Sequence, residues 1–349
     1  MGEHSKRKSL KSSSRRKPHS GKELMVKIMV QQIQNGTNLT INTVFILLGF
    51  SDHPELQTLL FLAFFIIYIL TVSGNLIIIV LVVNDAHLHT PMYFFLGNLS
   101  CLEICYTSTM VPRLLFSLLT GDRTVSVHGC IVQYFFCASL GCAECYLLAV
   151  MSYDRYLAIC RPLRYTYLMN GRICFWLLVI CWMASLSNVS VVTSLLFKLS
   201  FCGPNEIEHF FCDLAPMLKL SCSDIRLVEL VIFIFSSIDI VPPFLLTLIS
   251  YMIIIINILQ MRTKASRQKA FSTCSSHLIV VTLFYGSLIC VYLLPETKTM
   301  KEFHRIFSLF YTVFTPMLNP LIYSLRNREV KAAVYRITAK IFEVANSLC

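Results

Sequence analysis

Three carboxylic acids lie inside long apolar stretches of this sequence, where ionisable side chains are rare. Glu103 occurs in LSCLEICYTS, Glu144 in GCAEC and Asp239 in SSIDIVPP. Carboxylate oxygens are hard ligands that suit sodium, and a carboxyl group removed from water is otherwise stabilised by a proton. Glu103 and Glu144 together could hold a sodium ion or share a proton. Asp239 is expected to accept a hydrogen bond from a ligand or from a neighbouring helix.

An adjacent acid and base, Asp154 and Arg155, end another apolar run in MSYDRYLAICRPLRY, residues 151–165. In isolation, Arg155 could simply mark a membrane surface. Because a charged pair is costly to bury at such a boundary, it also suits an element with two arrangements. Arg155 would pair with its neighbour in one arrangement and with groups on other helices in the other.

Four of the 15 cysteines stand apart from the rest, which lie mostly in apolar runs. Cys202, Cys212 and Cys222 are spaced by ten residues, and Cys130 begins an apolar run. On an oxidising face these four can form two disulfides, and the sequence alone permits three pairings. His209 and Cys212 have a spacing that could bind metal, but a bridged sulfur is a poor ligand.

The elements that must position these residues are membrane spans. Of the 349 residues 56% are hydrophobic and 14% charged, whereas an ordinary soluble domain has about 25% charged residues. Each apolar run can supply the roughly 20 residues of a helix that crosses a bilayer. The sequence therefore predicts an all-α membrane protein, a bundle of seven transmembrane helices. The seven predicted spans are Leu59–Val83, Met92–Leu119, Cys130–Tyr153, Ile173–Phe197, Ile225–Leu259, Phe271–Leu294 and Phe303–Leu325.

Prolines interrupt the second, fifth and seventh spans. Membrane helices tolerate proline when neighbouring helices satisfy the carbonyl groups that it frees. We therefore expect close helix neighbours at Pro112, at Pro242 and Pro243, and at Pro316 and Pro320.

The distribution of basic residues predicts the orientation. Thirteen Lys and Arg residues lie in the loop between spans three and four, the loop between spans five and six, and the C-terminal segment. The loops on the opposite side contain acidic residues. Basic loops stay in the cytosol, so the N-terminus is expected outside and the C-terminus inside. The sequons at Asn35 and Asn38 agree, because glycosylation occurs on the outer side.

The net charge of +11 is concentrated at the N-terminus. Residues 1–34 hold nine basic residues against two acids. A Ser-rich, basic and weakly apolar stretch of this kind is expected to be a disordered, solvated tail, with a functional basic patch as the alternative. Little charge remains for the rest of the chain, so no nucleic-acid partner is expected.

Six further motifs accompany MSYDRY in a fixed order along residues 38–328. They are FILLGFSDHPELQ at 45–57, GN at 74–75, HTPMYFFLGNLS at 89–100, SY at 250–251, KAFSTCSSHL at 269–278 and PMLNPLIYSLRN at 316–327. With seven spans, this series resembles the rhodopsin-like (class A) G-protein-coupled receptors, and specifically the olfactory receptors.

The resemblance implies a multi-pass receptor of the plasma membrane that binds small volatile molecules. It would activate a stimulatory G protein of the olfactory type, raise cyclic AMP and depend on a trafficking chaperone. The implied domains are an extracellular tail over residues 1–55, a receptor domain over 56–327 and a short cytosolic tail over 328–349.

The resemblance also assigns roles to single residues. Arg155 would be the cytosolic latch, with Tyr251 and Tyr323 as its partners after activation. Asn319 and Pro320 would form a hinge. The implied coupling set is Asp154, Arg155, Tyr156, Tyr251, Asn319, Pro320 and Tyr323. Cys130 would pair with Cys212 and Cys202 with Cys222, and Asn75 would lie in a polar network at the midplane.

The resemblance implies a pocket among the outer halves of spans three, five, six and seven, and helical spacing gives an independent estimate of its residues. Residues three or four apart share a helix face, and each stripe could instead serve interhelical packing. The expected pocket is small and largely apolar, with a few polar groups. Its candidate residues are Cys137, Ala138, Gly141, Cys142, Phe235, Ser236, Asp239, Tyr285, Leu288, Ile289, Tyr292 and Thr312.

Other classes of function fit less well. The sequence contains no HExxH, no GxSxG and no phosphate-binding glycine loop, so an enzyme is not expected, and no cofactor is expected beyond the sodium ion. The intramembrane acids would also suit a transporter or channel, but no internal repeat is evident. A related receptor that reads a metabolite in another tissue stays open, because fold and motifs leave the ligand undetermined.

Overall fold

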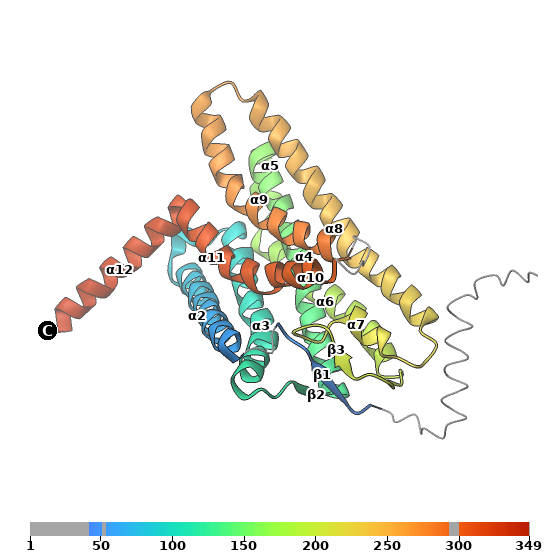
Figure 1. Cartoon of the computed structure of the whole chain (residues 1–349). Helices are drawn as coiled ribbons and strands as arrows, with labels where there is room; N and C mark the ends of the chain where they lie inside the picture. Colours follow the sequence, from blue (N-terminus) through green and yellow to red (C-terminus); the bar gives the residue numbers. More distant parts are fainter. Residues whose placement is uncertain (1–41, 51–53, 293–299, 349) are drawn as a thin grey trace, which may run out of the picture. The chain divides into compact units, whose positions relative to one another are not determined.

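The structure, a computed structural model, describes residues 42–50, 54–292 and 300–348, which belong to one unit, Asn42–Cys349. The basic N-terminal stretch and the sequons at Asn35 and Asn38 lie outside the described residues. The described part of the chain is a bundle of long helices with a small sheet at one end (Figure 1).

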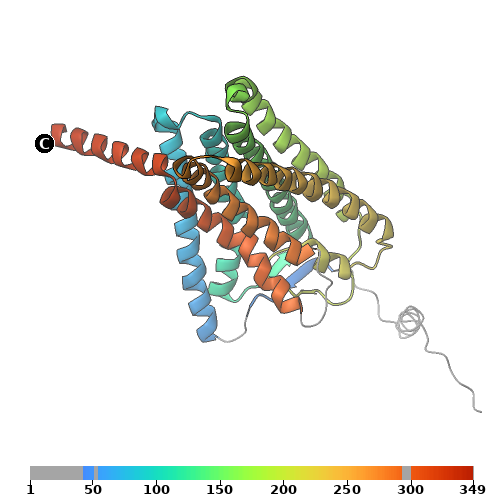
Figure 2. The same cartoon turned by 90° about the horizontal axis from the view of Figure 1, so that it is seen from above.

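Seven helical segments match the seven predicted spans (Figures 1 and 2). The last span is built of three consecutive pieces, of which the middle one is a π-helix. The segments are α2 (Pro54–Asn84), α3 (Pro91–Thr120), α4 (Val127–Cys160), α6 (Gly171–Leu196), α8 (Arg226–Gln260), α9 (Lys264–Tyr292) and the series α10 (Met300–Leu309), η2 (Phe310–Phe314) and α11 (Thr315–Arg326).

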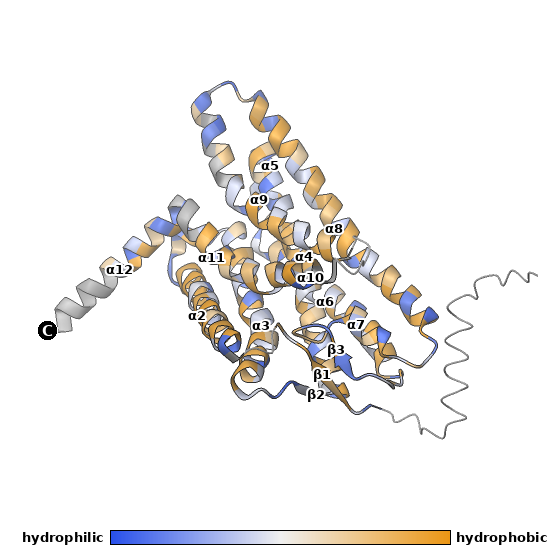
Figure 3. Cartoon of the chain, in the orientation of Figure 1, coloured by the Kyte–Doolittle hydropathy of each residue, from blue (hydrophilic) through white to orange (hydrophobic). Residues whose placement is uncertain are grey.

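Apolar composition explains most of these helices. Six helices of the described residues are long and apolar enough to cross a membrane. Hydrophobic residues predominate along these helices (Figure 3), and many of their large apolar side chains are exposed. The exception is α3, which carries Glu103 and several hydroxyl side chains. It packs most extensively on α2 and α4, and its polar side chains Ser100, Glu103 and Thr107 are buried among other helices.

Local signals set several helix ends. The side chain of Ser126 accepts a hydrogen bond from the Gly129 backbone and begins α4, and Asn170 begins α6 in the same way through Ile173. These side chains satisfy backbone N–H groups that have no partner inside the helix. At the end of α3, Gly121 adopts a φ of 74°, the left-handed conformation that glycine allows.

Pro320 explains the contact between the first and last spans. Proline has no N–H, so the carbonyl group of Pro316, four residues earlier, loses its partner inside α11. The side chain of Asn75 in α2 donates a hydrogen bond to that carbonyl oxygen at 3.1 Å. A Cβ atom at Gly74 would meet Pro320 at 3.1 Å, so the GN pair allows the two helices this close approach.

A three-stranded sheet closes one end of the bundle. The strand β1 (Val44–Leu47) lies in the middle, antiparallel to β2 (Thr124–Ser126) and parallel to β3 (Glu206–Ile207). Phe45 pairs with Val125, and Leu47 pairs with Ile207. The sheet therefore ties the segment before α2 to the loop between α3 and α4 and to the loop between α6 and α8.

Three short elements and a C-terminal helix complete the fold. They are η1 (Ala86–Leu88), α5 (Pro162–Leu168) and α7 (Leu214–Lys219), and α12 (Arg328–Leu348) follows the last span. The sequence predicted only a short tail over residues 328–349, and the structure forms a helix there. Arg336 donates two hydrogen bonds to Asp85, at 2.9 and 2.6 Å, and so ties α12 to the loop after α2.

Candidate functional site

Asp154 and Arg155 form a closed pair at the end of α4. The Arg155 guanidinium donates to one Asp154 oxygen at 3.0 and 2.6 Å, and the Tyr165 hydroxyl of α5 donates to the other at 2.9 Å. Asp154 is fully buried, and 12% of the Arg155 side chain is exposed. Arg155 is thus held by its neighbour, in the first of the two arrangements that the sequence suggested.

Two tyrosines lie near this pair without bonding to it. The Tyr251 hydroxyl of α8 lies 2.6 Å from Nδ1 of His277 in α9. The Tyr323 hydroxyl of α11 is buried and has no hydrogen-bond partner among the described residues. Both tyrosines lie within electrostatic reach of the Arg155 guanidinium, and Tyr156 packs on the Tyr251 side of the bundle.

Asn319 and Pro320 lie apart from the Arg155 end, together with Glu103. The Asn319 amide donates a hydrogen bond to the Glu103 carboxylate, which is fully buried. Glu144 of α4 is also fully buried and interacts electrostatically with Glu103. The structure thus brings the two predicted acids together, between α3, α4 and α11.

The oxygens around this acidic pair suit a hard cation. Within the described part of the chain, one Glu103 oxygen, both Glu144 oxygens and the amide oxygens of Asn75 and Asn319 are buried without a hydrogen-bond partner. Such groups are normally paired, because an unpaired buried oxygen loses its water without compensation. Carboxylate and amide oxygens are the donor set for sodium, and a proton on one carboxyl group would also reduce the charge.

Asp239 of α8 joins three helices. One carboxylate oxygen accepts hydrogen bonds of 2.6 Å from the Tyr146 hydroxyl of α4 and from the Asn188 amide of α6, and the other faces the Cys142 thiol at 3.5 Å. Asp239 is 4% exposed. Of the two predicted roles, the contact with neighbouring helices is present, and a ligand would have to compete with these donors.

The predicted pocket residues do not all face one space. On α4, Cys137 is buried against Thr109, and Ala138, Gly141 and Cys142 are half-buried. On α8, Phe235 is half-buried, while Ser236 is exposed on the outer surface and does not face the interior with Asp239.

The candidates on the last two spans also separate. The Tyr285 hydroxyl donates to the backbone oxygen of Cys145 at 3.0 Å, Leu288 is buried, and Ile289 lines a cleft between α8 and α9. Thr312 is buried in the π-helix and donates to the Ser308 carbonyl. The side chain of Tyr292 lies outside the described residues.

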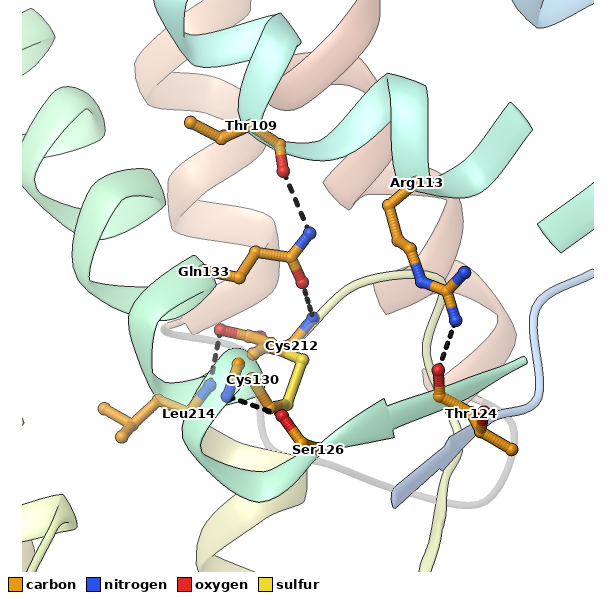
Figure 4. Close-up of a disulfide and its surroundings, with 10 residues drawn as sticks. Thr109, Arg113, Thr124, Ser126, Cys130, Gln133, Cys212 and Leu214 are labelled. Carbon is orange, nitrogen blue, oxygen red and sulfur yellow. Dashed lines mark hydrogen bonds between the residues drawn. A yellow bond between two sulfur atoms is a disulfide. The ribbon is translucent and has the colours of Figure 1, made fainter. Parts of the chain in front are cut away.

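Two disulfides lie at the sheet end. Cys130 is joined to Cys212 with a Cα–Cα distance of 5.3 Å, and Cys202 to Cys222 with 5.9 Å. Gln133 supports the first bridge, because its amide oxygen accepts from the Cys212 backbone and its amide nitrogen donates to the Thr109 carbonyl (Figure 4). This side chain holds the loop against α3 and α4, and the sequence analysis did not single it out.

The loop segment before Cys212 places the rings of His209, Phe210 and Phe211 inside the sheet end of the bundle. We call these three side chains the aromatic plug. His209 lies between Phe210 and Phe211, with ring centroids 4.6 and 4.5 Å apart, and all three side chains are buried. Phe210 and Phe211 belong to the same core cluster as Tyr106 and Cys137. Burial, with the nearby charge of Arg305, lowers the pKa of His209 to about 3. The aromatic residues of EHFFCDL are evident in the sequence. No rule of residue spacing predicts that they pack together inside the bundle.

A further feature of the Arg155 end was missed from the sequence. Leu163 in α5 is 98% exposed, although it lies beside the Asp154–Tyr165 contact rather than on an apolar span.

Comparison with known proteins decides the family. A family model described as "Olfactory receptor" matches residues 64–340. The chain belongs to the olfactory receptor family. The receptor is 50% identical to mouse olfactory receptor 5AP2, over 87% of this chain and 96% of the relative. It is 47% identical to human olfactory receptor 5B21, over 87% of this chain and 98% of the relative.

A solved structure supports the fold. The receptor resembles squid rhodopsin with a TM-score of 0.64 at 17% identity, covering 84% of this chain and 88% of the other. The seven-helix architecture and the family make this a multi-pass receptor of the plasma membrane. Family membership places it among the G-protein-coupled receptors for odorants, a receptor class rather than an enzyme class, and disfavours the transporter interpretation.

Proposed function

We propose that this receptor binds a small, mostly apolar volatile ligand and activates a stimulatory G protein of the olfactory type, which raises cyclic AMP. The observation that carries the proposal is the closed Asp154–Arg155 pair. A buried arginine held by one neighbour, with two tyrosines within electrostatic reach, is a latch with a second set of partners available.

Activation in this scheme exchanges the partners of Arg155. Its guanidinium leaves Asp154 and bonds to Tyr251 and Tyr323, whose helices α8 and α11 move with them. The exchange opens the end of the bundle that carries α5, where Leu163 is exposed to a G protein. The basic loops at this end support a cytosolic position for it, with the N-terminus outside and glycosylated at Asn35 and Asn38.

We assign the ligand pocket to the region between α4, α8, α9 and η2, on the inner side of the aromatic plug. Its proposed lining is small and mainly apolar and comes from buried or half-buried residues, which are Cys137, Ala138, Gly141, Cys142, Phe235, Leu288 and Thr312. Asp239 supplies a carboxylate acceptor in this part of the bundle, and its neighbours Tyr146 and Asn188 are neutral donors that a ligand could replace. A ligand with a hydroxyl or amine group is therefore the favoured class.

The acidic pair is proposed to hold sodium or a shared proton in the resting receptor. Glu103, Glu144, Asn75 and Asn319 would supply the oxygen ligands, and the bound cation would reduce the repulsion between the carboxylates. The bond from Asn319 to Glu103 connects this site to α11, next to the Pro320 hinge.

The test is a cyclic AMP assay in cells that contain an olfactory-type G protein and a trafficking chaperone. A broad odorant panel is applied to the wild type, to Arg155→Ala and to Arg172→Ala, in which an exposed arginine of the same end is removed. We expect responses in the wild type and in Arg172→Ala and none in Arg155→Ala at equal surface expression. Equal responses in all three would exclude the latch.

A further inference from the structure

A cleft of about 250 Å³ lies between α8 and α9, in the half of the bundle toward Arg155. It is separate from the proposed ligand pocket, which lies closer to the three-stranded sheet. Both helices contribute residues over several turns. The lining residues are Phe244, Thr247, Leu248, Tyr251, Leu278, Val281, Thr282, Tyr285, Gly286 and Ile289.

The four hydroxyl groups of this lining all have partners within the protein. Thr282 donates to the Leu278 carbonyl at 2.8 Å, and Tyr285 donates to the Cys145 carbonyl at 3.0 Å. Tyr251 bonds to His277 at 2.6 Å, and Thr247 accepts from Ser152 at 3.5 Å. Each hydroxyl of the lining already has a partner within the protein, and the other lining side chains are apolar, so the cleft favours an apolar occupant.

The mouth of the cleft faces the bilayer. Leu248 and Thr282 line it and are also exposed. Near them on α8, Leu245, Ile249 and Met252 are exposed apolar side chains, as expected where a membrane helix faces hydrocarbon. The cleft is therefore an inlet of the lipid phase into the bundle.

Gly286 keeps the inlet open. A Cβ atom at this position would meet no heavy atom within 4 Å, so no side chain fills the space beside it. A void in a packed interior forfeits the dispersion contacts of its lining. A flexible hydrocarbon chain can restore these contacts without losing any hydrogen bond.

We infer that the cleft between α8 and α9 is a binding site for one acyl chain of a bilayer phospholipid. The chain enters between Leu248 and Thr282 and lies against Gly286, with Phe244 and Tyr285, whose ring centroids are 5.2 Å apart, at its inner wall. This site binds a lipid acyl chain, whereas the proposed pocket binds the odorant. The inference does not depend on the proposed function.

The test uses the full chain in lipid vesicles that contain phosphatidylcholine with a photoreactive diazirine in the middle of one acyl chain. After irradiation, mass spectrometry locates the adducts. We expect adducts on cleft residues of α8 and α9 to exceed, by fivefold or more, those on the exposed outer face of α2 at Ile66 and Ile77.

Gly286→Leu fills the cleft and is expected to reduce the α8 and α9 adducts at least fivefold without changing those on α2. Gly286→Ala is expected to give a smaller reduction, which keeps the test decisive if the larger side chain prevents folding. Gly171→Leu is the matched control, because a Cβ there also meets nothing within 4 Å and lies away from the cleft. Even labelling of α2 and the cleft, or a cleft signal that both Gly286 variants leave unchanged, would overturn the site.

Discussion

The Tyr251 hydroxyl and the His277 imidazole share a buried hydrogen bond of 2.6 Å that joins α8 to α9. Both residues lie within electrostatic reach of Arg155, yet Arg155 bonds to Asp154. The bond to His277 fixes the position of the Tyr251 hydroxyl on the α9 side, and we expect it to lengthen or break when α8 moves Tyr251 toward Arg155. His277 is thus a second restraint on the proposed latch.

Replacing His277 with phenylalanine should raise the basal signal. One buried hydrogen bond contributes about 1 kcal/mol, or roughly a fivefold change in an equilibrium constant. We expect His277→Phe to raise basal cyclic AMP by up to about fivefold and His277→Phe with Tyr251→Phe to return it to the wild-type level or below. An unchanged basal signal in His277→Phe at equal surface expression would show that this bond does not restrain activation.

Asp239→Asn should distinguish ligands by their hydrogen-bond donors. Losing the charge weakens an acceptor that is worth about 1.5–3 kcal/mol when it is ionised. We expect the half-maximal concentration to rise about tenfold or more for hydroxyl and amine ligands and to stay constant for ligands without a donor. Asn188→Ala removes a helix contact of Asp239 but keeps the carboxylate, so it serves as the comparison. An unchanged response to every active ligand in Asp239→Asn would rule out the ligand role.

Sodium should stabilise the purified receptor through the acidic pair. In wild type, replacing choline with sodium at constant ionic strength is expected to raise the melting temperature by a few degrees, as ligand binding to the folded state does. Glu144→Gln removes one charged ligand and should abolish the shift. If sodium has no effect on the wild type, the shared proton is the better description of Glu103 and Glu144.

The buried His209 should make the receptor sensitive to acid. Its pKa is about 3 in the folded protein and about 6.5 in an unfolded chain. Between these values the unfolded chain binds the proton and the folded receptor does not, so the free energy of unfolding falls as the pH falls below 6.5. At pH 5 the loss reaches about 2 kcal/mol.

Thermal unfolding at pH 7.5 and pH 5 checks this prediction. His209→Phe keeps an aromatic ring between Phe210 and Phe211 and should reduce the difference between the two pH values. His128→Phe replaces an exposed histidine and should leave the difference as in wild type. If all three proteins lose the same stability at pH 5, His209 is not the source.

Hydropathy located the spans because each apolar run had to be a helix in hydrocarbon. Predicted bounds such as Leu59–Val83 fall within α2 (Pro54–Asn84), and Ile225–Leu259 coincides with α8 to one residue. The expected neighbour at a proline is also present, since Asn75 bonds to the carbonyl that Pro320 frees. These features follow from local rules.

Other features depend on contacts that no local rule supplies. Val44–Leu47 becomes a strand because two loops, about 80 and 160 residues further along the chain, offer it partners. The choice between the two roles of Asp239 needed the positions of Tyr146 and Asn188 on other helices. Residues 328–348 form a helix that Arg336 ties to Asp85, a contact across most of the chain.

The central place of β1 in its sheet limits how the receptor can be shortened or tagged. A chain shortened to begin before Asn42 keeps Val44–Leu47, whereas a cut after Leu47 removes the strand to which both β2 and β3 bond. Such a cut would leave every membrane helix intact and still remove the strand partner of two loops, one of which would then be held mainly by the Cys130–Cys212 disulfide. Fusion partners for purification therefore belong ahead of Asn42, and a receptor truncated beyond that point should be judged by its loops as well as by its helices.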